Sequence, residues 1–382
     1  MARFREVRND RRVRPALRLL RPTLAAWGLA LLARHLLGCS GDVRANDAPD
    51  AEPPALVEPF AVASHAAAVV IPAAFHAATA ERRVVTLSAV GDCTLGDDVG
   101  SERAKGSFHR VVDDSGGDLA RPFSLVKAEL DKDDLTIANL EGTLTTAGCP
   151  DDPKFRFRGR PEFARMLARG GVELVTLANN HSEDCGLRGL EETKASLDAA
   201  GVGWFGLGKV DRRTVHGIEI VNLGYTGGRA EIRGRVARDV AREKKPDNLV
   251  VVSFHWGIES QHAATDVQVK LAHTAIDAGA DLVLGHHPHV LQGIEEYKGK
   301  RVVYSLGNFV FGGNAQPGEL ASMIYRARFE IVDDVLEPSV EAFIPIHISG
   351  DAVQNDFRPL LAEGKEADDI RSQLDRWSTL LP

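Results

Sequence analysis

The chain has 382 residues, of which 44% are hydrophobic, and its formal net charge is −8, so it can bury a large core in one or two domains. The charge is uneven, because residues 1–38 carry nine arginines against Glu6 and Asp10, a balance of +7 that leaves −15 on the remainder. Because residues 39–382 are this acidic, we expect no nucleic-acid partner.

The N-terminus is typical of an export signal. A basic region precedes the apolar stretch from Thr23 to Ala33, which is too short to span a bilayer comfortably. The following "LLGCS" resembles a bacterial lipobox, in which Cys39 would be lipidated after cleavage. We predict a signal peptide over 1–38 and an exported protein, periplasmic or at the cell surface, anchored to a membrane at Cys39. The alternative is an uncleaved, membrane-associated helix.

Residues 39–83 are rich in Ala, Pro, Glu and Asp and show little periodicity. This composition predicts a flexible linker. The folded domain is therefore expected over residues 84–382.

From Val84 onward, apolar runs typical of strands each end in a polar residue that could bind a metal or act in catalysis. These end residues are Asp92, Glu141, His181, His255, His289 and Asn308. Segments with helical spacing lie between the runs, at Leu187–Leu197 and Val267–Ala278. Strands that alternate with helices predict an α/β fold with a largely parallel sheet, whose active site forms at the carboxyl ends of the strands.

The stretch "DLVLGHHPHVLQG" carries three of these polar side chains. We expect a strand that ends at Gly285 and a loop beyond it, on which His287 and His289 point the same way and His286 points elsewhere. Neutral imidazoles that converge from one loop suit a metal site. The alternative is a loop whose histidines have no ligand role.

The strand ends together supply a mixed set of oxygen and nitrogen ligands, formed by Asp92, Glu141, Asn180, His255, His287 and His289. Such a set favours a hydrolytic centre with one or two divalent ions of Mn, Zn or Fe, bridged by Glu141. His181 would remain as a proton donor or charge stabiliser. The alternative is a set of polar residues that only cap strand ends.

The segment "KFRFRGR" alternates cations with Phe155 and Phe157, so Lys154, Arg156 and Arg158 share one face of a strand. This row suits the carboxylates or phosphates of a polyanionic substrate. A solvated outer face is the alternative.

The four cysteines allow three full pairings. In an exported protein, Cys149 and Cys185 can form a disulfide beside the expected site. Cys93 is then left as a small buried residue.

Six ordered motifs carry a resemblance to a known family: "AVGDCTLG", "IANLEGTLT", "LANNHSEDCGLRGL", "VVSFHWGIES", "GADLVLGHHPHVLQGIE" and "VVYSLGNFVF". They resemble the successive motifs of the CapA family of poly-γ-glutamate capsule synthesis proteins, which is similar in fold to the calcineurin-like metallophosphoesterases. The resemblance runs from Val84 to the C-terminus. It implies a layered sandwich of mostly parallel sheets flanked by helices, and it places the same six ligands in metal-binding motifs.

The resemblance also implies two supporting residues and one departure. Glu259 in "HWGIE" would orient His255, and Asn308 would line the site. Thr94 stands where metallophosphoesterases usually have a histidine. We therefore expect a firm metal site on Glu141, Asn180, His255 and His287 and a weaker one on Asp92, Glu141 and His289.

Two functional classes follow from these features. One is a metal-dependent hydrolase that cleaves a phosphoester or the γ-glutamyl amide bonds of a capsule polymer. The other is a non-catalytic accessory that binds the polymer and assists a membrane-bound synthase in exporting it.

Overall fold

The structure is a computed structural model that describes residues 82–151, 155–227, 230–351 and 353–381. The predicted signal peptide, Cys39 and nearly all of the predicted linker lie outside the described residues, and so does Lys154. Within the described ranges, no helix is both long enough and apolar enough to cross a membrane.

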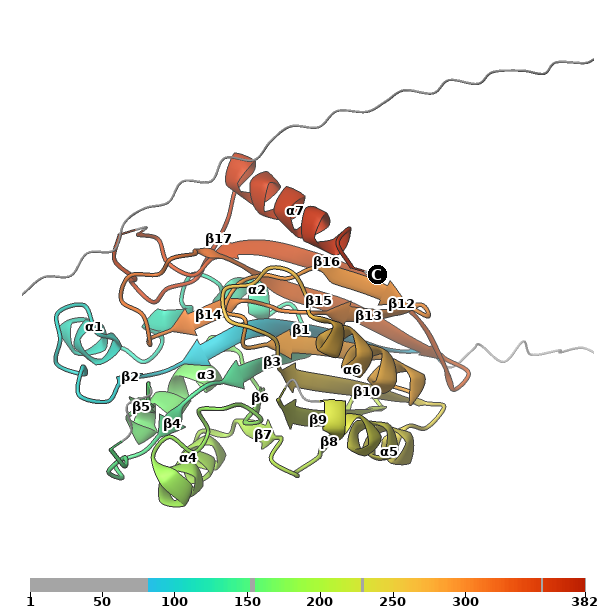
Figure 1. Ribbon diagram of the computed structural model, residues 1–382, viewed down its shortest axis with the longest axis horizontal. Helices are drawn as coiled ribbons and strands as arrows, with labels where there is room; N and C mark the ends of the chain where they lie inside the picture. The colour runs from blue at the N-terminus through green and yellow to red at the C-terminus, as the bar shows by residue number, and fades with distance from the viewer. Residues whose placement is uncertain (1–81, 152–154, 228–229, 352, 382) are drawn as a thin grey trace, which may run out of the picture. The chain divides into compact units, whose positions relative to one another are not determined.

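Two large sheets build the fold, and both are rich in parallel strands (Figure 1). The first runs in the order β17-β16-β15-β1-β3-β6-β7, with β14 paired to β1. Its strands are β1 (Arg82–Thr94), β3 (Leu135–Leu140), β6 (Leu174–Thr176), β7 (Gly203–Phe205), β14 (Asn308–Phe311), β15 (Ala321–Val332), β16 (Val335–His347) and β17 (Leu360–Leu361).

The second sheet runs in the order β12-β13-β11-β10-β9-β8. Its strands are β8 (Asp211–Val215), β9 (Ile218–Thr226), β10 (Asn248–His255), β11 (Leu282–His286), β12 (Ile294–Tyr297) and β13 (Lys300–Val303). A small third sheet joins β2 (Asp97–Asp98), β5 (Phe157–Gly159) and β4 (Thr143–Leu144).

The two large sheets pack face to face, because one core cluster draws on the inner faces of both. Val85, Leu87 and Ile137 of the first sheet share it with Val251 and Leu284 of the second, and all are buried. Strands covered on both faces must be apolar throughout, which explains why the sequence shows continuous apolar runs here rather than alternation.

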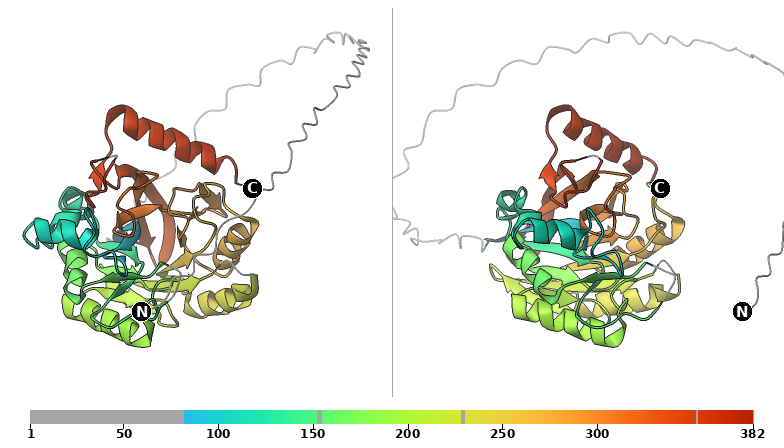
Figure 2. Two further views of the ribbon diagram at one scale, coloured as in Figure 1. Left: turned by 60° about the vertical axis from the view of Figure 1, so that its left-hand side comes forward. Right: turned by 90° about the vertical axis from the view of Figure 1, so that its left-hand side faces the viewer.

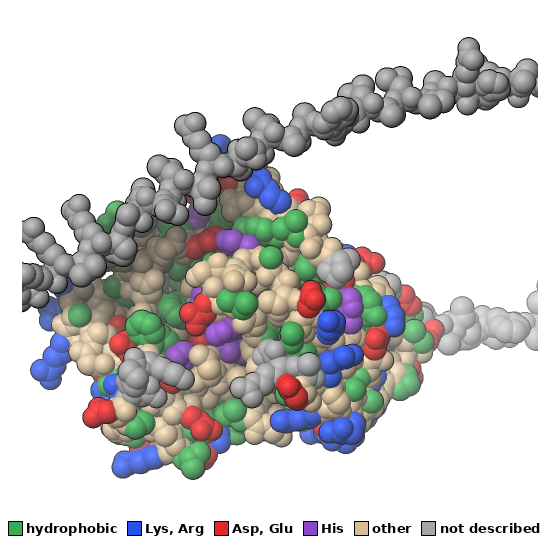
Figure 3. Space-filling model, viewed as in Figure 1, with side chains coloured by type: hydrophobic (Ala, Val, Ile, Leu, Met, Phe, Trp, Pro, Cys, Tyr) green, Lys and Arg blue, Asp and Glu red, His purple; other side chains and the backbone are tan. Residues whose placement is uncertain are grey.

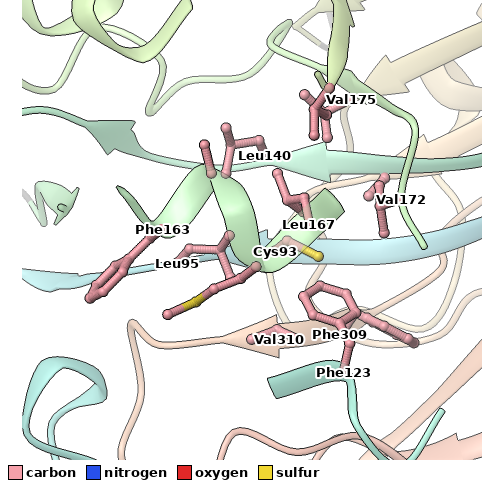
Figure 4. Close-up of a cluster of buried hydrophobic side chains, with 14 of the residues drawn as sticks. Cys93, Leu95, Phe123, Leu140, Phe163, Leu167, Val172, Val175, Phe309 and Val310 are labelled. Carbon is pink, nitrogen blue, oxygen red and sulfur yellow. The ribbon is translucent and has the colours of Figure 1, made fainter. Parts of the chain in front are cut away.

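Helices cover the outer faces of the sandwich. The core cluster on the first sheet includes residues of α1 (Phe108–Asp114), α2 (Lys127–Leu130), α3 (Ala164–Gly170) and α4 (Gly186–Ala200), and part of it is drawn in Figure 4. The cluster on the second sheet includes α5 (Arg233–Glu243) and α6 (Asp266–Asp277). The predicted α/β sandwich of mostly parallel sheets flanked by helices is therefore confirmed.

The last helix, α7 (Gly364–Ser378), lies across one edge of the sandwich, as the views of Figure 2 show. Ile370 and Leu374 on this helix are buried and join the core between the two sheets. This helix therefore closes an edge at which the apolar inner faces would otherwise meet water.

Strand register brings the polar strand ends together. Asp92 on β1 pairs with Asn139 on β3 and with Asn308 on β14. In the second sheet, His255 on β10 pairs with His286 on β11. The strand β11 thus extends one residue beyond Gly285, the predicted end, and this extension changes the direction expected for His286.

Candidate metal centre

The six predicted ligands meet at the carboxyl ends of the parallel strands. Ligand atoms of Glu141, His255 and His287 lie within 4.8 Å of one another, and so do those of Asp92, Glu141 and His289. The Asn180 Oδ1 atom lies 2.5 Å from His255 Nε2 and so completes the first group. The two groups contain the residues that the sequence analysis assigned to the two metal sites, and both share Glu141.

Glu141 is the residue whose surroundings most clearly fit a cation. Its side chain is fully buried, and neither carboxylate oxygen has a hydrogen-bond partner among the described residues. Burial raises the pKa of Glu141 well above its ordinary value, although His289 opposes that rise. A buried carboxylate without donors is costly, and a divalent ion held between carboxylate and imidazole ligands would remove the cost.

Asp92 is anchored from several directions. Asn139 donates to its Oδ1 over 2.9 Å, and the backbone amide of His287 donates to its Oδ2 over 3.2 Å. Burial acts to raise the pKa of Asp92, but hydrogen bonds from His286 and His289 outweigh it and hold this pKa well below its ordinary value. Asp92 therefore stays ionised, as a metal ligand must.

His286 does not turn away from the centre, contrary to the expectation from alternation along the loop. Its Nδ1 atom lies 3.0 Å from Asp92 Oδ1, and its side chain is almost fully buried. The cause is that His286 is the last residue of β11 rather than the first of a loop. It supports the carboxylate of Asp92 and is absent from both groups of close ligand atoms.

The loop after β11 holds its histidines in an unusual backbone conformation. His287 has φ +96° and His289 has φ +58°, a region that non-glycine residues seldom occupy. Such backbone strain clusters at functional sites. The two rings thereby stand 5.9 Å apart, each beside a different group of ligands.

The three histidines that were predicted as ligands differ in charge. Burial lowers the pKa of His255 and of His287, which leaves both rings neutral and able to bind a metal. Burial also acts to lower the pKa of His289, but Glu141 and Asp92 outweigh it and raise this pKa to about 10. Asn308 lines the site, with its Oδ1 atom 3.0 Å from His289 Nδ1.

Asn139 is a residue of the site that sequence reasoning missed. Its Nδ2 atom lies 2.9 Å from Asp92 and 3.4 Å from His255 Nδ1, and its Oδ1 accepts a hydrogen bond from Asn179. Its place in "IANLE", two residues before Glu141 on a strand end, was the available signal. Glu259 does not take the predicted role beside His255, because it is exposed and its carboxylate groups instead with His287 and His289.

His181 lies at the rim of the centre. Its Nδ1 atom is 2.9 Å from Asp184 Oδ2, and its ring packs 4.6 Å from that of Phe157. The carboxylate of Asp184, which sequence reasoning also missed, fixes the orientation of the ring. This contact engages Nδ1 and not Nε2.

Thr94 adds nothing to the weaker group of ligands. Its hydroxyl is buried and has no hydrogen-bond partner in the described part of the chain, and it is absent from the group formed by Asp92, Glu141 and His289. That group therefore offers three ligands where the other offers four.

Arg156 and Arg158 of "KFRFRGR" lie on the side of the strand away from the metal centre, whereas Lys154 is outside the described residues. Phe157 on β5 contacts His181, so alternation turns Arg158 to the opposite face, where its guanidinium lies 2.5 Å from Glu102. The Arg156 guanidinium donates to the carbonyl of Pro150. These two arginines therefore bond within the protein on the far side of the strand, and their role in holding a polyanion stays a prediction.

The cysteines pair as expected for an oxidising compartment. Cys149 and Cys185 form a disulfide with a Cα–Cα distance of 3.9 Å. Cys93 is free and buried among the apolar side chains of Figure 4, and burial raises the pKa of its thiol to about 12. Cys93 is therefore a packing residue rather than a reactive thiol.

The surface above the strand ends carries histidine and acidic side chains together. Figure 3 shows them gathered near the middle of the face that it presents. A pocket of about 280 Å³ opens beside His289 and Asn308, so the centre is accessible from outside.

Comparisons with known proteins agree with this geometry. The family model "Bacterial capsule synthesis protein PGA_cap" matches residues 86–313. The "PGA biosynthesis protein CapA" of Bacillus subtilis is 31% identical over 252 residues, which cover 60% of this chain and 63% of that protein. The "Capsule biosynthesis protein CapA" of Bacillus anthracis is 29% identical over 262 residues, covering 60% and 61%. The chain thus spans about three fifths of these relatives.

A third relative, a "Probable polyglutamine synthesis accessory protein" of Mycobacterium tuberculosis, is 32% identical over 211 residues, 46% of this chain and 55% of that protein. Among solved structures, a hypothetical protein from Thermus thermophilus covers 68% of this chain and 99% of its own, with 19% identity and a TM-score of 0.40. Because the family model matches more than half of the residues, the chain belongs to the bacterial capsule synthesis protein family, PGA_cap, which is metallophosphoesterase-like.

Proposed function

We propose that this protein is a metal-dependent hydrolase that acts in the biosynthesis of a capsule polymer of the poly-γ-glutamate type. The observation that carries the proposal is the buried carboxylate of Glu141, which has no hydrogen-bond donor and lies between two groups of ligand atoms. The printed names of the Bacillus relatives supply the biological context.

A bound divalent ion of Mn, Zn or Fe would polarise the phosphoryl or carbonyl oxygen of the substrate and activate water for attack. The protein's own side chains have separate tasks. Asp92, Glu141 and the neutral imidazoles would hold the ion, and Asn139 fixes Asp92 in place. His181, oriented by Asp184, is placed to give a proton to the leaving group.

The test begins with protein stripped by chelator. Mn, Zn and Fe are titrated back while metal content and the hydrolysis of p-nitrophenyl phosphate and of poly-γ-glutamate are measured. We expect turnover of at least one substrate to return with metal, and His287→Ala to lose both the metal and the turnover. His181→Ala should bind metal normally and lose turnover.

His216→Ala is the matched control, because this exposed histidine pairs with Asp134 and belongs to neither group of ligands. It should keep both properties of the wild type. If metal binds and neither substrate is cleaved, the hydrolase proposal fails.

A non-catalytic accessory is the second candidate. It is favoured by the weak ligand group beside Thr94 and by the word "accessory" in the name of the Mycobacterium relative. An accessory would bind the polymer and assist a membrane-bound synthase. Polymer binding that is insensitive to chelator, together with no turnover under any metal, is the result that this candidate predicts.

We also propose that the protein is exported and anchored to a membrane through lipid on Cys39. The arginine-rich start and "LLGCS" support this proposal, and the Cys149–Cys185 disulfide is consistent with an oxidising compartment. Mass spectrometry of protein from the membrane fraction should give a chain that begins at a lipidated Cys39. An unprocessed N-terminus in the cytoplasm would contradict it.

A further inference from the structure

We infer that a basic groove on the far side of β5 binds the carboxylates of an extended polymer chain. The groove is lined by Arg103, Arg158 and Arg160 together with Thr145 and Thr146, and its volume is about 790 Å³. This volume is within the range of pockets that hold small ligands. The identity of the polymer rests on the proposed function, whereas the binding of a polycarboxylate rests on the groove alone.

The groove and the metal centre lie on the two faces of one short strand. Phe157 on β5 packs against His181 at the metal centre, and Arg158, the next residue, points into the groove. The neighbouring strand β4 (Thr143–Leu144) makes the same connection, because Glu141 comes just before it and Thr145 just after. The groove and the metal centre are therefore separated by one short strand.

The charge of the groove differs from that of the rest of the protein. Three arginines line it against two carboxylates, those of Glu102 and Asp113, although the chain as a whole carries −8. Among the described residues Arg103 is exposed and has no ion-pair partner. A local excess of positive charge on an acidic protein favours a negatively charged ligand.

The arginines are already arranged to hold carboxylates. Arg160 binds Asp113 through two parallel hydrogen bonds of 2.7 Å, and Arg158 binds Glu102 over 2.5 Å. These pairs hold both guanidinium groups at the groove. Arg158 Nη1 also donates to the Ala147 carbonyl, and among the described residues each guanidinium keeps N–H donors beyond these bonds. Because partly exposed ion pairs are weak, a carboxylate of the ligand can share or replace the internal ones.

Arg103→Glu is the sharpest test, since this side chain is exposed and its loss breaks no ion pair among the described residues. Binding of poly-γ-glutamate to the full chain is measured at 0.15 M salt with chelator present, so that neither metal nor turnover contributes. We expect Arg103→Glu to weaken binding by about five- to tenfold. Arg169→Glu on α3 makes the same change in charge outside the groove and should stay within about twofold, because charges beyond about 8 Å are screened.

The possible outcomes separate clearly. Equal loss in both variants, or no binding by the wild type, would overturn the inference. Polyphosphate that binds more tightly than poly-γ-glutamate, with the same response to Arg103→Glu, would assign the groove to a phosphate polymer and overturn the carboxylate assignment. The chelator removes turnover, so a failed hydrolase assay does not affect the binding measurement. If hydrolysis is intact but the polymer does not bind in chelator, only the groove proposal is rejected.

Discussion

Replacing Glu141 by glutamine should stabilise the metal-free protein and abolish its stabilisation by metal. Glutamine has nearly the same shape as glutamate and no charge. In the wild type, Glu141 is fully buried, neither oxygen has a hydrogen-bond partner, and burial raises its pKa. A buried ionised carboxylate without a donor costs more than a neutral amide of the same shape, so Glu141→Gln should recover about 1–3 kcal/mol.

The sign of the pH dependence follows from the raised pKa. An unfolded glutamate ionises at its ordinary pKa, whereas folded Glu141 holds its proton to higher pH. In the wild type, this group's contribution to folding is therefore fully present below the unfolded pKa and is lost as the pH rises toward the folded pKa. The stability gap between Glu141→Gln and the wild type should accordingly widen from pH 4.5 to pH 7.5.

Thermal unfolding in chelator and in metal is the assay. At about 2 °C per kcal/mol for a chain of this size, Glu141→Gln should melt about 2–6 °C above the wild type in chelator. Metal at about 100 times its Kd should then stabilise the wild type by about 2.7 kcal/mol and the variant hardly at all. A variant that melts below the wild type in chelator, or that gains as much from metal, would refute the reasoning.

Three further predictions concern the same centre and its surroundings. His287→Ala should lower metal affinity more than His289→Ala, because it removes a ligand from the group of Glu141, Asn180, His255 and His287. Metal affinities are measured by calorimetric titration, and an equal loss of affinity in the two variants would show that the two groups are wrongly ranked. Binding of metal beside His289 at pH 8 should release about one proton, since the pKa of this ring is about 10 without metal. Calorimetric titrations in buffers of different ionisation enthalpy measure the number of protons released. If no proton is released, His289 is not a ligand. Replacing Cys149 and Cys185 by serine should lower the unfolding free energy by about 2–4 kcal/mol, because the bridge closes a loop with a sequence separation of 36; unchanged denaturant midpoints under oxidising conditions would count against this.

The sequence alone determined where the chemistry of this protein lies. Apolar runs that each end in a ligand-type residue require strands whose carboxyl ends meet, and parallel pairing then brings these ends to one side of the sandwich. For that reason the α/β fold was predictable, and so was the family, through its ordered motifs. The same pattern indicated Asp92, Glu141 and His255 as neighbours, because each lies at or just after the end of a strand.

Only the tertiary structure decided which neighbour supports which ligand. His286 binds Asp92 because β11 extends by one residue, and Asn139 lies beside His255 because the two large sheets meet there. Neither contact joins residues close in sequence, so no local pattern records it. For a similar reason, the sequence does not decide which side of β5 faces the metal centre. Alternation puts Phe157 and Arg158 on opposite sides of the strand, but only the packing of Phe157 against His181 shows that Phe157 is on the side of the metal centre.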